Sequence, residues 1–593
     1  MNKLFFGDNL HVLKNEIGDN SIDLVYLDPP FNSKAQYNVF YETPDNEKAT
    51  AQRTVFRDTW AWEDEAQSAY QEILSAGGPT AAIVNALRNS LGRSDTMAYL
   101  VMMTVRLRQL YRALKPTGSL YLHCDPTAAH YIKIILDAVF GAQNFRSEVI
   151  WKRTGAHGRA KRWGPVHDNI FFYSVSEHYT WNRTYEEYDR EYVEKFYNKE
   201  DAFGRFQAIT LDGPGKRGGS SGAQWRGVNP TEKGRHWELP PDRSLPSWFV
   251  KPIGYDKMNV QERLDLLDAA GLIAWPDKGT NPRFKRYLSV SEGNPVQDVI
   301  TDIGPLSSHA KERVGYPTQK PVALLERIIK ASSNKGDVVL DPFCGCGTTV
   351  HAAENLNRQW IGIDVSYYAI RLISRRLRSV VGPGKLKIGG IPADYTSAEA
   401  LADRDPYGFQ QWIVGELGCQ LWNDGKKGSD RGIDGEMYFM NGPGPAGRLL
   451  VQVKGGKHTG PRDLRDFAWV LNRENAEMGL FVCRNQPTKE MRGEAAELGV
   501  HRIGSTTYPR LRIVDMASWF AGQRPQMPVA IEMRPVTDKS VPKPKRSRRP
   551  DPRQPQFSYV FTGGIEKAAE DGQVFNPDIL PDEAAGVVRR KSA

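Results

Sequence analysis

The stretch IDLVYLDPPFNS, residues 22–33, ends an apolar run with an acid, two prolines and an aromatic residue. Its first half has the composition of a buried strand, and proline cannot continue a central strand because it donates no backbone hydrogen bond. We therefore predict that the strand stops at Asp28 and that Pro29, Pro30 and Phe31 form a stiff loop after it. In open α/β sheets, ligands bind at the edge where the strands have their carboxyl ends.

The 593-residue chain exceeds what one hydrophobic core usually supports, so we expect two or three domains. Hydrophobic residues make up 40% and charged residues 25%, as in ordinary soluble globular proteins. No apolar run of about 18 residues predicts a membrane span, and the N-terminus lacks the apolar stretch of a signal peptide. The five cysteines have no zinc-site spacing and suit a reducing compartment. These features predict a cytoplasmic protein without a membrane partner.

Strand and helix patterns alternate over the first 150 residues and resume near residue 316, which predicts a largely parallel sheet with helices on both faces. Between these parts, residues 151–315 are rich in Gly, Pro, Trp and charged residues, and we interpret them as an inserted functional module. A Gly/Pro break at 381–392 indicates a domain boundary. The resulting division is a first domain, a smaller α/β domain and a basic, Pro-rich tail expected to be disordered, at 1–385, 393–525 and 526–593.

The formal net charge of +9 suits a nucleic-acid partner. The segment WKRTGAHGRAKRW, residues 151–163, has five basic side chains and no acid. A solvated surface explains many basic runs, but this one is framed by tryptophans and begins the inserted module, which favours contact with phosphates. The residues expected to bind DNA are Lys152, Arg153, Arg159, Lys161 and Arg162.

A second strand of this kind ends in VVLDPFCGCGTT, residues 338–349, where an acid and a glycine-rich turn lead into a helix. Glycines let the backbone approach a ligand and leave the helix N-terminus open to polar contacts. The next strand ends at Asp364, where a carboxylate can accept both ribose hydroxyls of a nucleoside cofactor. A glycine turn alone is a weak signal, but this strand, helix and acid together favour a nucleoside site.

The two motifs together resemble those of the DNA amino methyltransferases, which transfer a methyl group from S-adenosylmethionine to the exocyclic nitrogen of adenine or cytosine. DPPF precedes the glycine motif, an order similar to the circularly permuted beta class. GYPTQKPVALLERII at 315–329 and FFGD at 5–8 resemble two further signatures of that class. The resemblance covers residues 1 to about 385 and implies a Rossmann-like sheet with an inserted target-recognition region.

The resemblance also implies roles for individual residues. Asp28 and the Asp28–Pro29 peptide accept hydrogen bonds from the target amine, whose lone pair is otherwise delocalised, and the prolines fix these acceptors. Phe31 stacks on a base flipped out of duplex DNA. His123, at another strand end, either lines the pocket or is structural. Because members with Asp before Pro-Pro mostly act on adenine, we favour adenine N6 over cytosine N4. The expected cofactor contacts are Asp8, Thr318, Gln319, Lys320, Asp341, Phe343, Gly345, Gly347 and Asp364.

The C-terminal block contains a predicted hairpin at residues 430–457. Along its second strand, Gln452 and Lys454 alternate with Val451 and Val453 and therefore share one face. A surface hairpin would explain this pattern, but the helices predicted after it cover that face, and a buried lysine needs partners.

Asp434 with Gln452-x-Lys454 on such a hairpin resembles the Mrr-like branch of the PD-(D/E)xK restriction endonucleases, over about residues 400–515. The resemblance implies that Asp434 and Gln452 bind Mg²⁺ while Lys454 activates the attacking water. Glu416, on the preceding predicted helix, is a candidate further acid. Gln452 replaces the acid of the common motif and so weakens metal binding by one charge.

We therefore expect a single-chain restriction–modification protein of a bacterium or phage that methylates and cuts double-stranded DNA, either as a monomer or as a homodimer. One alternative is a cytosine-N4 DNA methyltransferase whose C-terminal domain is a catalytically silent DNA-binding module. A weaker one is a methyltransferase that acts on RNA or protein. The sequence has no Gly-x4-Gly-Lys-[Ser/Thr] loop, so we expect no ATP motor in this chain.

Overall fold

The chain forms two compact units, residues 1–536 and 537–593, in a computed structural model. In the second unit, β27 (Gln573–Val574) pairs antiparallel with β28 (Val588–Arg589). Among the residues described, no helix is both long and apolar enough to cross a membrane. The structure describes residues 2–30, 36–42, 48–57, 60–155, 161, 163–276, 281–307, 310–316, 318–381, 386–422, 432–442, 445–531, 573–574 and 588–589.

A nine-stranded sheet in the order β16-β6-β7-β5-β2-β17-β18-β1-β19 is the frame of the first unit. Neighbouring strands are parallel except around β7, which runs antiparallel to β5 and β6, so the expected α/β class is confirmed. Its strands are β1 (Lys3–Phe6), β2 (Ile22–Leu27), β5 (Leu114–Cys124), β6 (Phe145–Lys152), β7 (His167–Ser174), β16 (Val299–Ile300), β17 (Val338–Asp341), β18 (Gln359–Asp364) and β19 (Lys387–Gly389).

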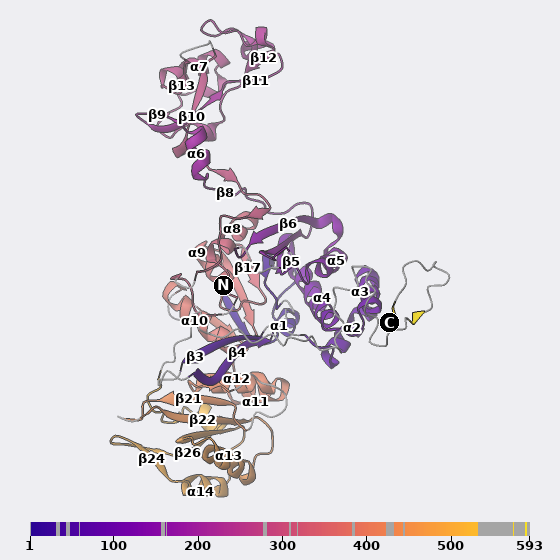
Figure 1. Cartoon of the computed structure of the whole chain (residues 1–593), viewed down its shortest axis with the longest axis vertical. Coiled ribbons are helices and arrows are strands. Elements are labelled where there is room, and N and C mark those ends of the chain that lie inside the picture. Colours follow the sequence, from indigo (N-terminus) through magenta and orange to yellow (C-terminus); the bar gives the residue numbers. More distant parts are fainter. Residues whose placement is uncertain are drawn as a thin grey trace. The chain divides into compact units, whose positions relative to one another are not determined.

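Helices cover both faces of this sheet, with α4 and α5 on one side and α8, α9 and α10 on the other (Figure 1). The amphipathic patterns that predict them bury one stripe of each helix against the strands. The strands β3 (Gln36–Glu42) and β4 (Lys48–Arg57) form a separate two-stranded antiparallel sheet. The helices are α1 (Asn9–Asn15), α2 (Asp64–Ala76), α3 (Gly78–Leu91), α4 (Asp95–Ala113), α5 (Ala129–Phe140), α8 (Val322–Ser332), α9 (Thr348–Asn355) and α10 (Tyr367–Val381).

The start of β2 is fixed to its two neighbours by one acid. Asp23 is the only position of β2 that is not fully buried. Its carboxylate accepts hydrogen bonds from Lys115 Nζ at 2.8 Å and from the Val338 N–H at 2.9 Å. The starts of β2, β5 and β17 are therefore held together, which leaves their other ends side by side at the edge where a ligand is expected.

The inserted module is smaller than the sequence suggests. Two segments of the expected region 151–315, β7 and β16, are strands of the main sheet. Between them lies a body with its own apolar core, which includes Phe206, Trp237 and Phe284. Its elements are β8 (Tyr185–Glu186), α6 (Arg190–Phe196), β9 (Lys199–Asp201), β10 (Gly204–Thr210), β11 (Asp212–Pro214), β12 (Arg235–Trp237), α7 (Val260–Ala269), β13 (Ile273–Ala274), β14 (Arg283–Tyr287) and β15 (Asn294–Pro295).

The C-terminal block has a five-stranded sheet in the order β20-β21-β22-β23-β26. Leu450 of β22 packs with α13, whereas the neighbouring Leu449 and Val451 belong to the opposite face. The elements are α11 (Tyr395–Arg404), α12 (Pro406–Glu416), β20 (Gln420–Leu421), β21 (Gly435–Phe439), β22 (Gly447–Lys454), α13 (Pro461–Arg473), β23 (Met478–Cys483), α14 (Lys489–Glu497), β24 (Val500–Ile503), β25 (Thr506–Pro509), β26 (Leu511–Asp515) and α15 (Met516–Phe520).

The boundary expected at 381–392 does not separate the two sheets. β19, at Lys387–Gly389, is the edge strand of the nine-stranded sheet although it follows residue 385. One buried apolar cluster extends from Leu4 and Phe6 of the first sheet to Trp412 and Leu449 of the C-terminal block. The two sheets therefore share a core and belong to one compact unit.

Candidate active site

Asp28 lies where the sequence predicts it, directly after β2. Its carboxylate forms an ion pair with the ammonium group of Lys320, and the two side chains are only 18% and 10% exposed. Pro29 is buried behind it, as expected for a stiff loop. Phe31 lies outside the described residues, so its stacking role stays a prediction. The structure thus brings the residue expected to hold the target amine into contact with one expected at the cofactor.

A buried chain of polar contacts lies beside Asp28. The Tyr26 hydroxyl is 2.8 Å from His123 Nδ1, and His123 Nε2 is 3.1 Å from Asp168 Oδ2. Asp168 Oδ1 in turn pairs with Arg153 Nε at 3.2 Å. Burial and the charge of Lys320 lower the pKa of His123, so its ring is neutral. A neutral imidazole donates from one nitrogen and accepts on the other, which assigns Nε2–H to the carboxylate and leaves Nδ1 to accept from tyrosine.

The charge of Asp168 supports this assignment. Burial alone would raise the pKa of this carboxyl, but the hydrogen bond from His123 and the nearby Lys320 and Arg153 lower the pKa below its usual value. An ionised carboxylate can only accept hydrogen bonds. Both ring nitrogens of His123 therefore have defined partners, as expected if this buried histidine is structural.

The glycine turn between β17 and α9 has the conformation that its sequence predicts. Gly345 and Gly347 have φ values of +51° and +76°, in the left-handed region that favours glycine. A Cβ at Gly347 would lie 2.7 Å from Cγ1 of Ile373, so a side chain is excluded there. The turn is closed by the Gly345 N–H, which donates to Asp364 Oδ2 at 2.8 Å.

Two buried carboxyl groups flank this turn. Asp364 Oδ1 accepts the Ser366 N–H at 2.8 Å, and burial raises the pKa of this carboxyl to about 6. Asp341 Oδ1 accepts the Phe343 N–H at 3.0 Å, and burial raises the pKa of Asp341 to about 7. Carboxyl groups with strongly shifted pKa values are concentrated at functional sites. A turn that admits no side chain and acceptors next to it together fit a nucleoside cofactor such as S-adenosylmethionine.

Asp8 joins the N-terminal motif to the same region. It caps α1 by accepting the His11 N–H, and its other oxygen accepts from Arg106 Nη2 at 2.8 Å. Arg106 also donates to Asn9, whose amide donates to the Pro342 carbonyl in the glycine turn. The sequence alone did not single out Arg106. The feature that could have identified it is its position on the buried stripe of the helix at 95–113, because a buried arginine requires an acidic partner.

The loop before α8 holds the remaining predicted cofactor residues. Thr318 is exposed and has a φ of +61°. The Gln319 side chain accepts the Val314 N–H at 2.9 Å and donates to the Glu312 carbonyl at 2.8 Å. Gln319 therefore fixes the shape of its own loop, which presents Lys320 to Asp28.

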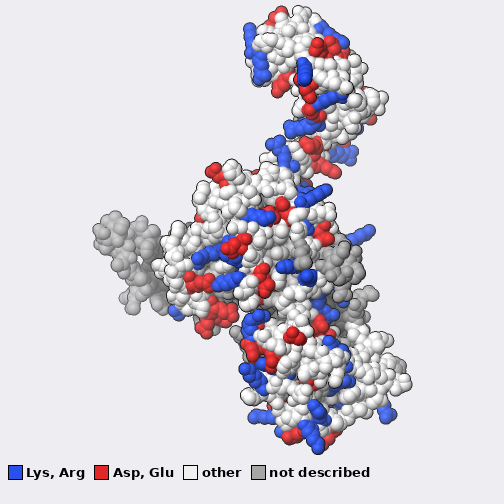
Figure 2. All heavy atoms as spheres, turned by 180° about the vertical axis from the view of Figure 1, so that it is seen from behind, with Lys and Arg blue, Asp and Glu red and all other residues white. Residues whose placement is uncertain are grey.

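The basic segment is only partly available to a phosphate. Lys152 and Lys161 are exposed, whereas Arg153 is engaged by Asp168. Arg159 and Arg162 lie outside the described residues. On the face seen in Figure 2, basic and acidic side chains are interspersed and form no single basic patch. Contact of this segment with DNA stays a prediction, and Arg153 has a structural partner that the sequence did not suggest.

The hairpin of the C-terminal block forms as predicted, with Gly435 opposite Val451. Asp434 thus lies across from Gln452, but its Oδ2 accepts the Val453 N–H at 2.6 Å. Gln452 is 7% exposed, and its Oε1 has no hydrogen-bond partner among the described residues. Lys454 Nζ is 3.5 Å from Asp463 Oδ1.

These residues do not form a metal site as placed. Among the described residues there is no group of three or more His, Cys, Asp or Glu that could hold a metal ion. Glu416, the candidate further acid, accepts a hydrogen bond from Tyr367 on α10 instead. The set Asp434 and Gln452 therefore fits Mg²⁺ poorly, because it offers one charge and that carboxylate is already engaged.

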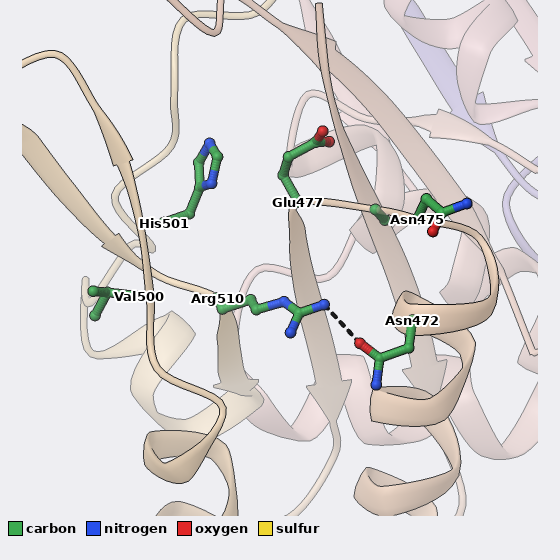
Figure 3. Close-up of a pocket in the computed structure, with 7 residues that line it drawn as sticks. Asn472, Asn475, Glu477, Val500, His501 and Arg510 are labelled. Carbon is green, nitrogen blue, oxygen red and sulfur yellow. Dashed lines mark hydrogen bonds between the residues drawn. The ribbon is translucent and has the colours of Figure 1, made fainter.

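A pocket of about 300 Å³ in the C-terminal block is distinct from both predicted sites. Arg510, His501, Glu477 and Asn475 line it, and Arg510 donates to Asn472 at 2.7 Å, as Figure 3 shows. Glu477 also accepts the Arg448 N–H at 2.7 Å. Its polar groups are thus largely engaged with the protein, and none of the sequence-predicted residues lines it.

Comparison with known proteins gives two family matches. Residues 22–375, more than half of the chain, match the model of a family described as DNA methylase. Residues 408–512 match the model of a family described as NACHT-associated inactive restriction endonuclease 1. The second match agrees with the expected endonuclease-like block but not with the expected cleavage activity.

Curated relatives agree with the first match. The chain is 34% identical over 280 residues to the type II methyltransferase M.EcaI of Enterobacter cloacae, covering 47% of this chain and 57% of the relative. It is 27% identical over 380 residues to the Mod subunit of the type III restriction-modification enzyme StyLTI of Salmonella typhimurium, covering 60% and 50%. The chain thus spans about half the length of these relatives. The crystal structure of the M1.HpyAVI–SAM complex aligns with 64% of this chain and 99% of its own, at 14% identity and a TM-score of 0.28.

Proposed function

The chain belongs to the DNA methylase family of adenine-N6 and cytosine-N4 methyltransferases, and we propose that it methylates an exocyclic amine of a base in double-stranded DNA, with S-adenosylmethionine as methyl donor. The observation that carries this proposal is the adjacency of the two acidic strand ends. β2 and β17 pair directly, with Leu24 opposite Val339 and Val25 opposite Leu340. Asp28 and Asp341 therefore follow neighbouring strands at the same edge of the sheet.

The residues at this edge suit activation of a weak nucleophile. An amine on an aromatic ring is a poor nucleophile because its lone pair is delocalised. Asp28 accepts a hydrogen bond from that amine, which localises the lone pair on nitrogen, and Lys320 holds the carboxylate in position. The bound cofactor supplies a methyl group on a positively charged sulfur. Because Pro29 and Pro30 stiffen the strand end, the acceptor is positioned before the base arrives, and positioning contributes much of such a rate enhancement.

The cofactor is held by this chain's backbone and carboxylates. Asp364 offers its remaining lone pairs to the ribose hydroxyls, while Gly345 and Gly347 give the turn the left-handed backbone that lets it pass close to the nucleoside. Asp341 lies at the end of β17, next to the amine site, and accepts from the amino group of the methionine moiety. Arg106 and Asp8 hold the end of β1 beside this pocket.

We favour adenine N6 as the methylated position because an aspartate precedes Pro-Pro, and the members that have aspartate there mostly act on adenine. Double-stranded DNA is the proposed substrate, and the inserted body between β7 and β16 is the proposed reader of its sequence. The test is nucleoside mass spectrometry of DNA from a methylation-free host that expresses the chain. N6-methyladenine is expected, N4-methylcytosine would correct the base, and the absence of both would contradict the function.

For the C-terminal block we propose a module that does not cleave DNA. The supporting observations are the engaged carboxylate of Asp434 and the match to a family described as inactive. A nicking assay on unmodified plasmid with Mg²⁺ or EDTA tests this. Cleavage that requires Mg²⁺ and is lost in Lys454→Ala would restore the nuclease predicted from the sequence.

A further inference from the structure

The turn that carries the cofactor acid is held by a side chain from the endonuclease-like block. Asp364 ends β18, and α10 begins three residues later at Tyr367. The first N–H of α10, on Tyr367, donates to Oε1 of Gln411 at 3.0 Å. Gln411 belongs to α12, inside the region that matches the restriction-endonuclease family. An N–H at a helix start has no partner within the helix, so Gln411 supplies one from outside it.

Three further contacts join the same two helices, α10 and α12. The Tyr367 hydroxyl donates to Glu416, and Arg371 donates to the carbonyl of Gly415. The two helices approach so closely that a Cβ at Gly415 would lie 2.6 Å from Cδ1 of Tyr367. α12 therefore contacts α10 through both its side chains and its backbone, over its last two turns.

The other side of Tyr367 contacts the cofactor region itself. Its ring packs edge-to-face on Phe6, with 5.2 Å between the ring centroids. Phe6 lies opposite Asp364 in the parallel pairing of β1 and β18, and the Gly7 N–H donates to the Asp364 carbonyl at 3.0 Å. A shift of Tyr367 would therefore reach Asp364 both along the chain and through β1.

Burial makes the Gln411 contact costly to lose. Gln411 is 7% exposed and Tyr367 is 4% exposed. Removing the amide would leave the Tyr367 N–H buried without an acceptor at that position, which the turn can relieve only by moving. The sequence pattern could not reveal this, because the two residues are 44 positions apart.

We propose that Gln411 is a positioning residue for S-adenosylmethionine, so that the endonuclease-like block is a structural part of the methyltransferase cofactor site. The inference rests on the proposed function, since it requires that Asp364 binds the cofactor. Glu416 and Tyr367 act in the same way, by fixing the start of α10. None of the three touches the cofactor in this assignment.

The test compares four variants and a matched control by calorimetric titration of the full chain with S-adenosylmethionine. Gln411→Leu removes the acceptor, whereas Gln411→Glu keeps one. Glu416→Ala and Glu416→Gln form the second such pair. Gln410→Leu, at the neighbouring half-buried position of α12, is the matched control. Titrations are made well below the melting temperature of every variant, which is measured separately.

Gln411→Leu is expected to weaken cofactor binding about tenfold, the size of one lost hydrogen bond to a buried group. Gln411→Glu, Glu416→Gln and Gln410→Leu should stay within about twofold of the wild type, on the same scale. A Gln411→Leu variant that melts earlier but binds the cofactor with unchanged affinity would overturn this proposal alone. A wild-type chain without measurable affinity for the cofactor would overturn the proposed function as well.

Discussion

Lys320 and Asp28 form an ion pair although 292 positions separate them in the chain. Lys320 follows the loop that Gln319 braces, and Asp28 directly follows β2, so the contact joins the segment before α8 to the proposed amine acceptor. Both side chains are largely shielded from water, which strengthens their attraction relative to a surface pair. The proposed amine site at Asp28 and the proposed cofactor loop at Lys320 are therefore in direct contact.

Replacement of Asp28 should separate chemistry from cofactor binding. Asp28→Ala removes the acceptor for the amine but none of the cofactor contacts at Gly345 or Asp364. We expect methyl transfer to fall by at least about 100-fold, as when one preorganised acceptor or donor is removed from an active site. Calorimetric titration with S-adenosylmethionine should give a Kd within about threefold of the wild type. A loss of affinity equal to the loss of activity would show that Asp28 lies at the cofactor.

The buried series of hydrogen-bonded side chains from Tyr26 to Arg153 should affect kcat by fixing the position of His123. Asp168→Asn keeps the shape of the side chain but removes the charge that fixes the His123 tautomer. We expect kcat to fall about 10- to 100-fold, because small displacements of reacting groups have effects of this size, with the cofactor Kd unchanged.

Asp302→Asn is the matched control for Asp168, since it removes another aspartate–arginine pair, with Arg327 at 2.8 Å, that makes no hydrogen bond to His123 among the described residues. If both variants lower kcat equally, the effect is general destabilisation and the tautomer argument fails. Tyr26→Phe, which deletes only the hydroxyl at the end of the chain of contacts, should give a smaller loss than Asp168→Asn.

The sequence predicts those parts of this site whose structure depends on only a few consecutive residues. Prolines end β2 at Asp28, and the glycine turn takes its shape from Gly345 and Gly347, wherever the rest of the chain lies. The partners of His123 could not be predicted, because Asp168 follows 45 positions later on a strand that reads as part of the irregular insertion. The contacts of the predicted magnesium ligands could not be predicted either, since no pattern reveals that Val453 donates to Asp434.

The pKa of Asp341 predicts a stability effect of defined sign. Burial raises it to about 7 in the folded chain, against about 4 when unfolded, so the folded state binds the extra proton between these values. The contribution of Asp341 to stability should therefore fall as pH rises from 4 to 7, and remain constant above 7. An asparagine side chain at this position would not titrate, so the stability of the cofactor-free Asp341→Asn variant relative to the wild type should increase by about 3 kcal/mol between pH 5 and pH 8.

Thermal unfolding of cofactor-free wild type and Asp341→Asn, scanned from pH 5 to pH 8, measures this difference. The two melting curves should converge toward pH 5 and separate as pH rises. A gap that stays constant across the range would mean that the Asp341 carboxyl is ionised throughout. Addition of S-adenosylmethionine should favour the wild type, because the variant loses a charged acceptor.

The exposed lysines of the basic segment should affect DNA binding without affecting chemistry. Lys152→Ala combined with Lys161→Ala is expected to weaken binding to all duplexes and to reduce the slope of log K against log salt by about two. Lys335→Ala is the control, because Lys335 is exposed at the opposite end of β17. An unchanged slope in the double variant would make the segment a solvated surface. Arg153→Ala should instead lower kcat, as Asp168→Asn does.

Truncation distinguishes a shared core from separable domains. Trp412 and Leu449 of the C-terminal block belong to the same buried cluster as Phe6 of the first sheet. A chain ended at residue 392 would expose this apolar surface, and burial of such side chains contributes about 2 kcal/mol each. We expect that chain to be insoluble or to melt far below the full length, whereas one ended at residue 536 should keep its affinity for S-adenosylmethionine. A well-folded, active 1–392 fragment would show instead that the first sheet needs no support from α12. Its own helices would then bury the apolar side chains that contact the C-terminal block in the full-length chain.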